Sequence, residues 1–231
     1  MEEKKVFFFE DYFLAPEYVF QPRPETELLV EIAIEHIKKY LYEISKPKKE
    51  KFILADVGTG TGCIIISIYK KIEKLLNILE IPYKMIGIDI DMKTLKIAVH
   101  NSKILNSRVD FVLGNLLEPI KQADFIVSNP PYVSLKVKDK ISIPDPPHTI
   151  FGGEKGYETI LKLIAQAYSV LKENGFLLIE VGYDDLKFFD LEELKNEYKK
   201  EIFSFAKNLG LKLFPPVKDY NKLERILIFQ K

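Results

Sequence analysis

The chain has 231 residues, a length that suits one compact domain with modest additions. Hydrophobic residues make up 47% and charged residues 29%, which is ordinary for a soluble globular protein, and no apolar run approaches the roughly 18 residues of a membrane span. The charge totals, 34 Lys and Arg against 34 Asp and Glu, lack the basic excess typical of proteins that bind nucleic acid through phosphates.

The N-terminus and the cysteine content indicate a location. The stretch MEEKKVFFFEDYF has a short apolar patch, but acidic residues flank it and no cleavage-site pattern follows, unlike a signal peptide. A single cysteine, Cys63, excludes an internal disulfide and fits a reducing cytoplasm. We therefore expect a cytoplasmic protein with no membrane partner and no direct nucleic-acid binding.

The first half of the chain predicts alternating helices and strands. Apolar residues at helical spacing predict a helix over 24–44, with Pro24 suited to its first turn, and a polar connector over 45–51. The continuous apolar run 52–57 predicts a buried strand, and glycines lead from it into a helix. The elements that complete this half are the helix 62–79, the strand 83–90, the helix 92–105, and the strands 109–114 and 123–128.

The second half opens with a long loop. After this loop, 132–153, we expect a helix over 154–172, a strand over 176–182, a helix over 185–209, and strands in LKLFPPV (211–217) and RILIFQ (225–230). The last two strands are joined by too few residues for a parallel crossover, so they should pair antiparallel. Apolar strands alternating with helices favour an α/β, Rossmann-like, doubly wound fold: a seven-stranded, mostly parallel sheet with an antiparallel C-terminal hairpin strand.

A glycine-rich loop follows the strand 52–57. Ligands of such sheets bind beyond the carboxyl ends of the strands, near the point where the strand order reverses. A dinucleotide fingerprint would need glycine at the position of Cys63, and no Gly-Lys-Ser/Thr follows to make a P-loop. A G-x-G-x-G loop after an acidic residue instead resembles the S-adenosylmethionine methyltransferases, and the alternative is a turn with incidental glycines. The resemblance assigns the cofactor to Asp56, Gly58, Thr59, Gly60, Thr61 and Gly62.

Polar side chains end the next two strands. Asp89 ends the strand 83–90, where a carboxylate can accept hydrogen bonds from both ribose hydroxyls, while Asp91 is better placed to cap the following helix. Asn115 follows the third strand, where methyltransferases of this architecture often place a polar side chain that reads the adenine amino group. Leu116 would then lie beside the adenine ring. Asp is the commoner residue at the position of Asn115, and a plain turn residue is the alternative reading.

The strand 123–128 ends abruptly in Asn129-Pro130-Pro131-Tyr132. Two prolines cannot continue a central strand because neither donates to the ladder, so the chain leaves the sheet here. A planar amino group is a poor nucleophile, and two acceptors, the Asn129 side-chain oxygen and the Pro130 carbonyl, could orient its nitrogen and stabilise the charge that grows on it. Tyr132 could pack on the flat face of the substrate. We assign Asn129, Pro130, Pro131 and Tyr132 to catalysis, with Asn129 also beside the cofactor.

Several motifs together resemble the HemK/PrmC family of protein-(glutamine-N5) methyltransferases over nearly the whole chain. QPRPETELLVE (21–31), DVGTGTG (56–62), SNPPY (128–132), IFGGEKGYETI (150–160) and KDYNKLERILI (218–228) resemble its motifs, with Glu224-Arg225 where Asp-Arg is more usual. The resemblance implies an S-adenosylmethionine-dependent methyltransferase fold with S-adenosyl-L-methionine as cofactor. It also implies a peptide chain release factor as protein substrate, methylated on the glutamine of its GGQ loop.

The resemblance also implies a domain division. The family's bacterial members usually carry a helical N-terminal domain, whereas here only residues 1–22 precede PRPETE. We expect a short N-terminal strand segment over 1–22 and a methyltransferase domain over 23–231, without the helical domain.

Other readings stay open. NPPY also occurs in enzymes that methylate amino groups of adenine or cytosine, so an amino group in DNA or RNA is an alternative substrate, as is a glutamine of a ribosomal protein. A non-catalytic, cofactor-binding partner subunit is the alternative to an enzyme. No metal site is expected, because His36, His100 and His148 share no ligand spacing and no cysteine cluster exists. Cys63 reads as a small residue packed at a helix start.

Overall fold

The computed structural model describes residues 4–44, 51–142 and 145–231. The connector expected over 45–51 therefore lies outside the described residues except for Lys51. The helices are α1 (Pro24–Ile44), α2 (Cys63–Ile78), α3 (Met92–Ile104), α4 (Glu158–Val170) and α5 (Glu192–Asn208), with the 3-10 helices η1 (Leu135–Lys140), η2 (Pro147–Thr149) and η3 (Tyr183–Phe189). The strands are β1 (Lys5–Phe8), β2 (Asp11–Leu14), β3 (Phe52–Val57), β4 (Tyr83–Asp89), β5 (Asp110–Leu113), β6 (Ala123–Ser128), β7 (Val133–Ser134), β8 (Phe151–Gly153), β9 (Leu171–Glu180), β10 (Lys212–Leu213), β11 (Val217–Lys218) and β12 (Glu224–Gln230).

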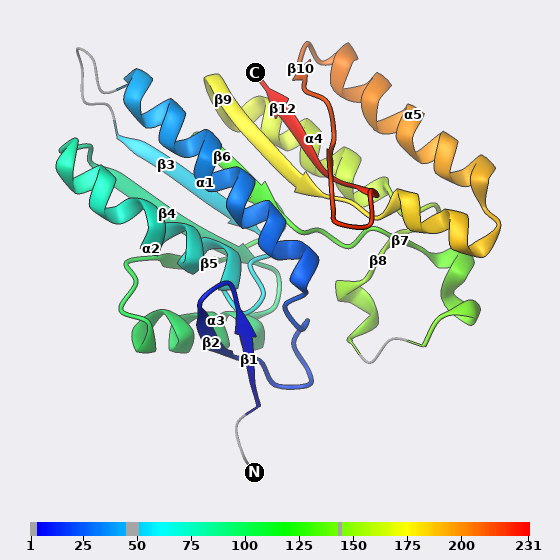
Figure 1. The fold of residues 1–231 in the computed structure, drawn as a ribbon, viewed down its shortest axis with the longest axis horizontal. Coiled ribbons are helices and arrows are strands. Elements are labelled where there is room, and N and C mark those ends of the chain that lie inside the picture. Colours follow the sequence, from blue (N-terminus) through cyan, green and yellow to red (C-terminus); the bar gives the residue numbers. More distant parts are fainter. Residues whose placement is uncertain (1–3, 45–50, 143–144) are drawn as a thin grey trace.

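The central sheet is mostly parallel and has the predicted architecture (Figure 1). Its strands lie in the order β10-β12-β9-β6-β3-β4-β5, with β11 also paired to β12. Strand β3 pairs parallel with β4 on one side and with β6 on the other, whereas β12 pairs antiparallel with β9. The predicted α/β fold class, with its antiparallel C-terminal strand, is confirmed.

The boundaries depart from expectation in three places. The predicted strand 211–217 is divided into β10 and β11, because Pro215 and Pro216 have no N–H to give to the ladder. The helix expected over 185–209 is divided at Asp190, whose φ of 57° ends η3 before α5 begins. The helix expected from residue 154 starts four residues later, after the β8 segment has paired with β7.

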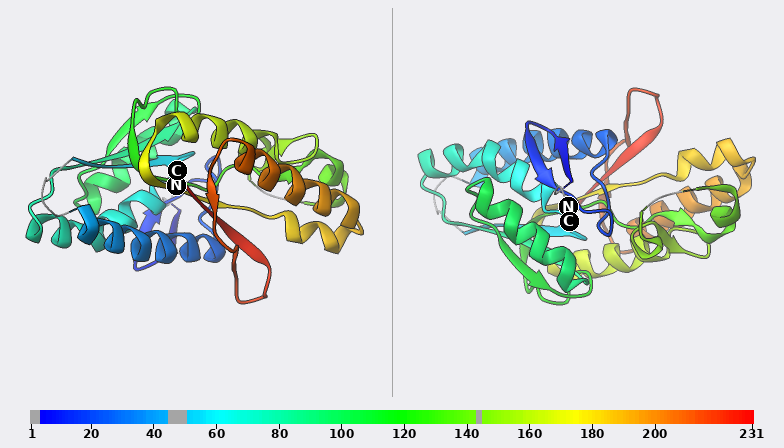
Figure 2. Two further views of the ribbon diagram at one scale, coloured as in Figure 1. Left: turned by 90° about the horizontal axis from the view of Figure 1, so that it is seen from above. Right: turned by 90° about the horizontal axis from the view of Figure 1, so that it is seen from below.

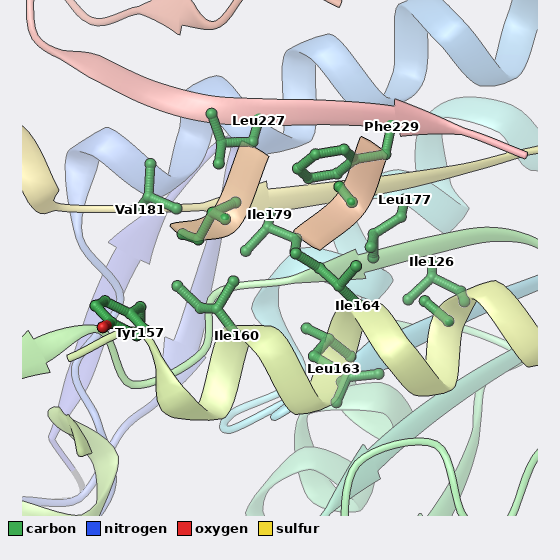
Figure 3. Close-up of a cluster of buried hydrophobic side chains, with 14 of the residues drawn as sticks. Ile126, Tyr157, Ile160, Leu163, Ile164, Leu177, Ile179, Val181, Leu227 and Phe229 are labelled. Atoms are coloured by element: carbon green, nitrogen blue, oxygen red, sulfur yellow. The ribbon is translucent and has the colours of Figure 1, made fainter. Parts of the chain in front are cut away.

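Both faces of the sheet are covered, so the strands are apolar on both sides. Side chains at alternate positions of the strands point into two different cores. Leu54, Phe125 and Leu178 pack in the first core, with α1 and α2. Their neighbours in the same strands, Ile126 and Ile179 among them, pack against α4 and α5, and Figure 3 shows Ile160, Leu163 and Ile164 of α4 pointing into this second core. Figure 2 shows α1 and α4 on opposite faces of the strands.

The N-terminal segment forms a hairpin of β1 and β2. Its Phe8 and Phe13 are buried in the core that contains α1 and α2. The backbone N–H of Leu14 donates to Asn101 Oδ1 at 2.8 Å, and Asn101 Nδ2 donates to the carbonyls of Leu14 and Thr61 at 3.0 and 2.9 Å. The hairpin is thereby tied, through one buried amide of α3, to the glycine loop.

Candidate active site

The glycine loop and the NPPY segment meet because their strands are neighbours. Val57, the last residue of β3, is opposite Ser128, the last residue of β6, so the segments that follow emerge side by side. The strand order reverses between these two strands, since β4 and β5 continue one way and β9 the other. This is the place at which open α/β sheets bind ligands.

A cavity of about 260 Å³ lies at this place. Its walls combine the glycine loop, the ends of β4 and β5, the start of α1, and the loop 132–153. Figure 1 shows these segments at the end of the sheet where the parallel strands finish. Of the residues predicted to bind the cofactor or act in catalysis, those that line it are Gly58, Thr59, Gly60, Thr61, Asp89, Asn115, Leu116, Asn129 and Pro131. Asp56, in β3, and Gly62, the N-cap of α2, do not line it, and Pro130 and Tyr132 line a smaller adjoining cavity.

The loop's backbone is exposed to the cavity because Gly58 and Gly60 lack side chains. Their φ angles are +70° and +56°, values that favour glycine. A Cβ on Gly58 would find nothing nearer than the Asn129 carbonyl oxygen at 4.0 Å, and one on Gly60 nothing nearer than the Gly58 oxygen at 3.9 Å. The space is open, so a side chain there would occupy the room that a ligand needs.

Asp56 supports the loop from below. It is fully buried, and its Oδ2 accepts a hydrogen bond from the Thr59 hydroxyl at 2.7 Å. Burial raises its pKa to about 7, although Thr59 lowers it in part. Its Oδ1 has no hydrogen-bond partner among the described residues. The geometry therefore gives Asp56 a role in holding the loop.

Asp89 presents its carboxylate at the cavity wall. Oδ2 accepts from the Gly60 N–H and Oδ1 from the Asp91 N–H, both at 3.0 Å, so the side chain is fixed while each oxygen keeps a second lone pair. Burial raises the pKa of Asp89, and these two N–H groups oppose that shift. Asp91 caps α3, accepting from the Lys93 N–H at 3.0 Å, as the sequence predicted.

Asn115 and Leu116 follow β5 at the far end of the cavity. The Asn115 Nδ2 donates to Glu118 Oε1 at 3.2 Å, which leaves its side-chain oxygen available as an acceptor. Leu116 has a φ of 52°, a left-handed value that is unusual for a bulky residue and that the turn imposes. Its side chain lines the cavity and, with Ile90, supplies an apolar wall of the kind that an adenine ring requires.

The Asn129 side chain is oriented by α1. Its Nδ2 donates to the Thr26 Oγ1 at 3.0 Å. The amide oxygen is therefore the end left to accept a hydrogen bond from a ligand. Both residues line the large cavity, and Asn129 also lines the smaller one.

The smaller cavity has a volume of about 100 Å³. It is lined by Phe20, Arg23, Asn129, Pro130, Pro131, Tyr132, Val133, Thr149 and Ile150. Behind it, the Tyr132 hydroxyl donates to Glu180 Oε1 at 3.3 Å, and burial raises the pKa of Tyr132. The ring lies so close to Gly182 that a Cβ there would come within 2.4 Å of it.

The loop 132–153 returns to the NPPY segment. Val133 donates to the Ile150 carbonyl at 2.9 Å, in the short parallel pairing of β7 and β8. Beside the smaller cavity, which Arg23 lines, the Arg23 guanidinium forms an ion pair with the buried Asp145, whose other oxygen accepts from the Gln21 N–H at 2.9 Å. The segment before α1 and the loop are thereby joined next to the site.

Sequence reasoning missed part of the lining. The cavity residues outside the predicted site are Phe20, Pro22, Thr26, Val57, Cys63, Ile64, Ile88, Ile90, Thr94, Gly114, His148, Thr149, Phe151 and Thr159. Thr26 lies inside the PRPETE motif, which was a usable signal. Val57, Cys63, Ile64, Ile88, Ile90 and Gly114 lie at the ends of β3, β4 and β5 or at the start of α2, next to predicted site residues. The rest come from the segment before α1, from α3 and α4, and from the loop 132–153, and no local pattern shows that these segments fold over the strand ends.

The cavity fits S-adenosylmethionine. Its lining offers an open backbone at Gly58 and Gly60, a fixed carboxylate at Asp89, and an apolar wall beside the Asn115 amide, which are the kinds of group that could hold the methionine, ribose and adenine parts. In the described ranges, no three His, Cys, Asp or Glu side chains are grouped to hold a metal ion. Within the same part of the chain, no helix is long and apolar enough to cross a membrane.

Comparison with known proteins agrees with this geometry. A family model described as "Methyltransferase domain" matches residues 48–230. Three relatives are release factor glutamine methyltransferases: from Koribacter versatilis (35% identity, covering 77% of this chain and 59% of the relative), Aquifex aeolicus (30%, 92% and 67%) and Thermodesulfovibrio yellowstonii (30%, 91% and 68%). The chain thus spans roughly three fifths to two thirds of their length.

Solved structures show the same fold at low identity. A ribosomal protein L11 methylase from Lactobacillus delbrueckii subsp. bulgaricus superposes with a TM-score of 0.52 at 19% identity, covering 94% of this chain and 82% of that one. A putative RNA methyltransferase from Pyrococcus horikoshii gives 0.54 at 16% identity, covering 92% and 86%.

The fold and the site define a methyltransferase of the class that uses S-adenosylmethionine. Within this class, the chain belongs to the family of the release factor glutamine methyltransferases.

Proposed function

We propose that this protein transfers a methyl group to the side-chain amide nitrogen of a glutamine, and that its substrate is the GGQ glutamine of a peptide chain release factor. The observation that carries the proposal is the Asn129 amide, whose nitrogen is engaged by Thr26 and whose oxygen is left as an acceptor between the two cavities. Relatives at 30% identity that span most of this chain are named for this activity.

The cofactor-binding roles divide among the strand ends. Gly58, Thr59, Gly60 and Thr61 would hold the methionine part, Asp89 the ribose hydroxyls, and Asn115 with Leu116 the adenine. Asp56 and Gly62 would shape the loop without touching the cofactor. When bound, S-adenosylmethionine supplies an activated methyl group on a positively charged sulfur.

The NPPY segment would act on the glutamine. An amide nitrogen is a weak nucleophile because its lone pair is delocalised into the carbonyl. Asn129 Oδ1 and the Pro130 carbonyl would accept its two hydrogens, which orients the nitrogen and stabilises the positive charge that develops there. The Tyr132 ring, fixed by Glu180 and Gly182, would form the wall on which the planar amide packs.

The identity of the substrate is tested by comparing candidate substrates in parallel. Purified release factor, ribosomal protein and nucleic acid are offered in parallel with labelled cofactor, and the product is mapped by mass spectrometry. We expect one methyl group on the glutamine of the release factor's GGQ loop and none on nucleic acid. Methylation of an adenine or cytosine amino group alone would replace the proposed substrate while leaving the amino-methylating site intact.

The role of Asn129 is tested by two substitutions. Asn129→Ala removes an acceptor that acts chiefly as charge develops, so single-turnover methylation of a release-factor fragment should fall by a factor on the order of a hundred or more. Asn129→Asp keeps an acceptor of the same shape but places a negative charge near the sulfonium, so we expect tighter cofactor binding with poor turnover. Turnover near wild type in Asn129→Ala would mean that NPPY serves only as the exit of β6 from the sheet.

A further inference from the structure

The two ends of an asparagine side chain have nearly the same shape but opposite hydrogen-bonding roles. The oxygen accepts and the nitrogen donates, so a rotation of Asn129 by half a turn would present N–H groups to the N–H groups of the target amide. Such an arrangement repels the substrate. The site therefore needs a device that fixes the orientation of Asn129, and the described residues around it provide one.

Thr26 is the direct contact. Its hydroxyl oxygen accepts from Asn129 Nδ2 at 3.0 Å, and only 2% of the residue is exposed, so water does not compete for it. A hydroxyl that accepts this bond still has its own hydrogen to donate. What receives that hydrogen decides whether Thr26 stays an acceptor toward Asn129.

Glu180, at the end of β9, is placed to receive it. The residue is 1% exposed, its Oε1 accepts from the Tyr132 hydroxyl at 3.3 Å, and its Oε2 has no hydrogen-bond partner among the described residues. The neighbouring Thr26 hydroxyl is close enough to lower the pKa of Glu180. An ionised carboxylate here already accepts from Tyr132 through Oε1, and its free Oε2 would be the acceptor for the Thr26 hydrogen.

We propose that Thr26 and Glu180 are positioning residues that orient the Asn129 amide, so that its oxygen faces the nitrogen to be methylated. Hydrogens then point one way along the chain, from Asn129 to Thr26 and from Thr26 to Glu180. The same carboxylate holds Tyr132, so one buried group on β9 fixes two parts of the NPPY segment. The inference rests on the proposed function, because it concerns the same site.

The orientation should depend on the charge of Glu180. A protonated carboxyl would donate to Thr26 instead of accepting, which releases the Thr26 hydrogen toward the Asn129 oxygen. The groups that face Glu180 are Thr26 and Glu25 on α1, Tyr132 after β6, and Arg225 on β12, which is paired with Asp185 of η3. Burial raises the pKa of Glu180 to about 7, while Thr26, Arg225 and Tyr132 oppose the shift.

Thr26→Val is the main test, because valine keeps the shape and removes the hydroxyl. We expect single-turnover methylation to fall by about tenfold or more, the scale of one lost hydrogen bond in a buried site. Cofactor affinity, measured by calorimetry, should change by less than about threefold, and Thr26→Ser should restore most of the turnover. A Thr26→Ser variant as poor as Thr26→Val would show that only packing matters and would overturn the proposal.

Two further measurements test the proposal even if Thr26→Val does not fold. Glu180→Gln should abolish the rise of turnover with pH around 7 that we expect of the wild type. In cofactor-free protein, the Asn129 side-chain NH₂ should be resolved by NMR as hydrogen-bonded and slow to exchange, and Thr26→Val should remove that protection. An unchanged pH profile in Glu180→Gln, or an unprotected Asn129 amide in the wild type, contradicts the proposed chain.

Asn129→Ala is measured beside these variants to separate the two proposals. If it is inactive while Thr26→Val has wild-type turnover, the positioning role fails and the proposed function stands. If Asn129→Ala itself retains turnover, the proposed site fails.

Discussion

At the scale of single residues, neighbouring carboxylates in this site have different tasks. Asp89 and Asp91 are two positions apart, yet Asp89 faces the cavity and Asp91 caps a helix. The difference arises because the strand ends at Asp89 and the chain turns into α3 immediately afterwards. This pair offers a matched comparison of a proposed ligand contact with a structural one.

Asp89→Ala should weaken S-adenosylmethionine binding by about 1.5–3 kcal/mol, the scale of hydrogen bonds to a charged group. The fold should persist, because the residue lies at a strand end. The control, Asp91→Ala, should lower the free energy of unfolding by about 1 kcal/mol through loss of the cap while leaving cofactor affinity close to wild type. Calorimetry measures the S-adenosylmethionine affinity of both variants. Equal affinities for Asp89→Ala and the wild type would mean that Asp89 does not bind the cofactor.

Gly182 is a second residue whose importance is steric. A Cβ at this position would lie 2.4 Å from the Tyr132 ring, closer than any real contact. Gly182→Ala should therefore displace the ring and lower turnover by an estimated tenfold or more, while cofactor affinity is retained. Gly210→Ala is the control for a glycine beyond the site, and it should cost stability only, because φ is +88° and nothing lies within 4 Å. Wild-type turnover in Gly182→Ala would show that the ring's position does not matter.

At the scale of elements, the loop 132–153 is the segment whose structure the pattern of strands and helices did not predict. It borders both cavities and is joined to the segment before α1 by the pair of Arg23 and Asp145, which lie 122 positions apart in the sequence. Asp145 is buried, so its ion pair is shielded from solvent more than a surface pair would be. The pair should hold the loop in the position that forms the substrate wall.

Asp145→Asn should loosen this loop. The variant keeps the shape but loses the charge, and we expect backbone hydrogen exchange in the β7 and β8 segments to become roughly tenfold faster. In the wild type, a bound release factor should slow exchange there further, because the loop borders the proposed substrate entrance. Lys39→Met, which breaks the exposed pair of Glu35 and Lys39, is the control and should leave the loop unchanged. Equal exchange in Asp145→Asn and the wild type would show that the ion pair does not restrain it.

The elements show where sequence reasoning succeeds. Continuous apolar runs gave β3 and β6 with their observed bounds, because strands buried on both faces have a pattern that turns interrupt clearly. The parallel order then placed the glycine loop beside Asn129. The contacts of Arg23 with Asp145 and of Thr26 with Asn129 could not be predicted from the sequence. They join segments that are far apart in the chain and come together only in the packed fold.

At the scale of the whole molecule, formal charges balance, and two buried carboxyls with raised pKa values, Asp56 and Glu180, lie at or near strand ends. Burial raises the pKa of Asp56 and of Glu180 to about 7, from 3.8 and 4.5. Each folded-state pKa is raised, so the folded protein binds more protons than the unfolded chain between these values. The stability that each carboxyl contributes is fully present below its unfolded pKa and is lost as pH rises through about 7.

Glu180→Gln should therefore flatten the dependence of stability on pH. In cofactor-free wild-type protein we expect the free energy of unfolding to fall between about pH 4 and pH 7, by roughly 3 kcal/mol from this group. Gln has no proton to lose in this range, so the variant should show a smaller slope whatever its absolute stability. Glu31→Gln makes the same chemical change at an exposed position and should keep the wild-type slope. Urea unfolding at a series of pH values gives both slopes; if Glu180→Gln retains the wild-type slope, Glu180 is ionised in the folded protein well below neutral pH, and burial alone does not govern it.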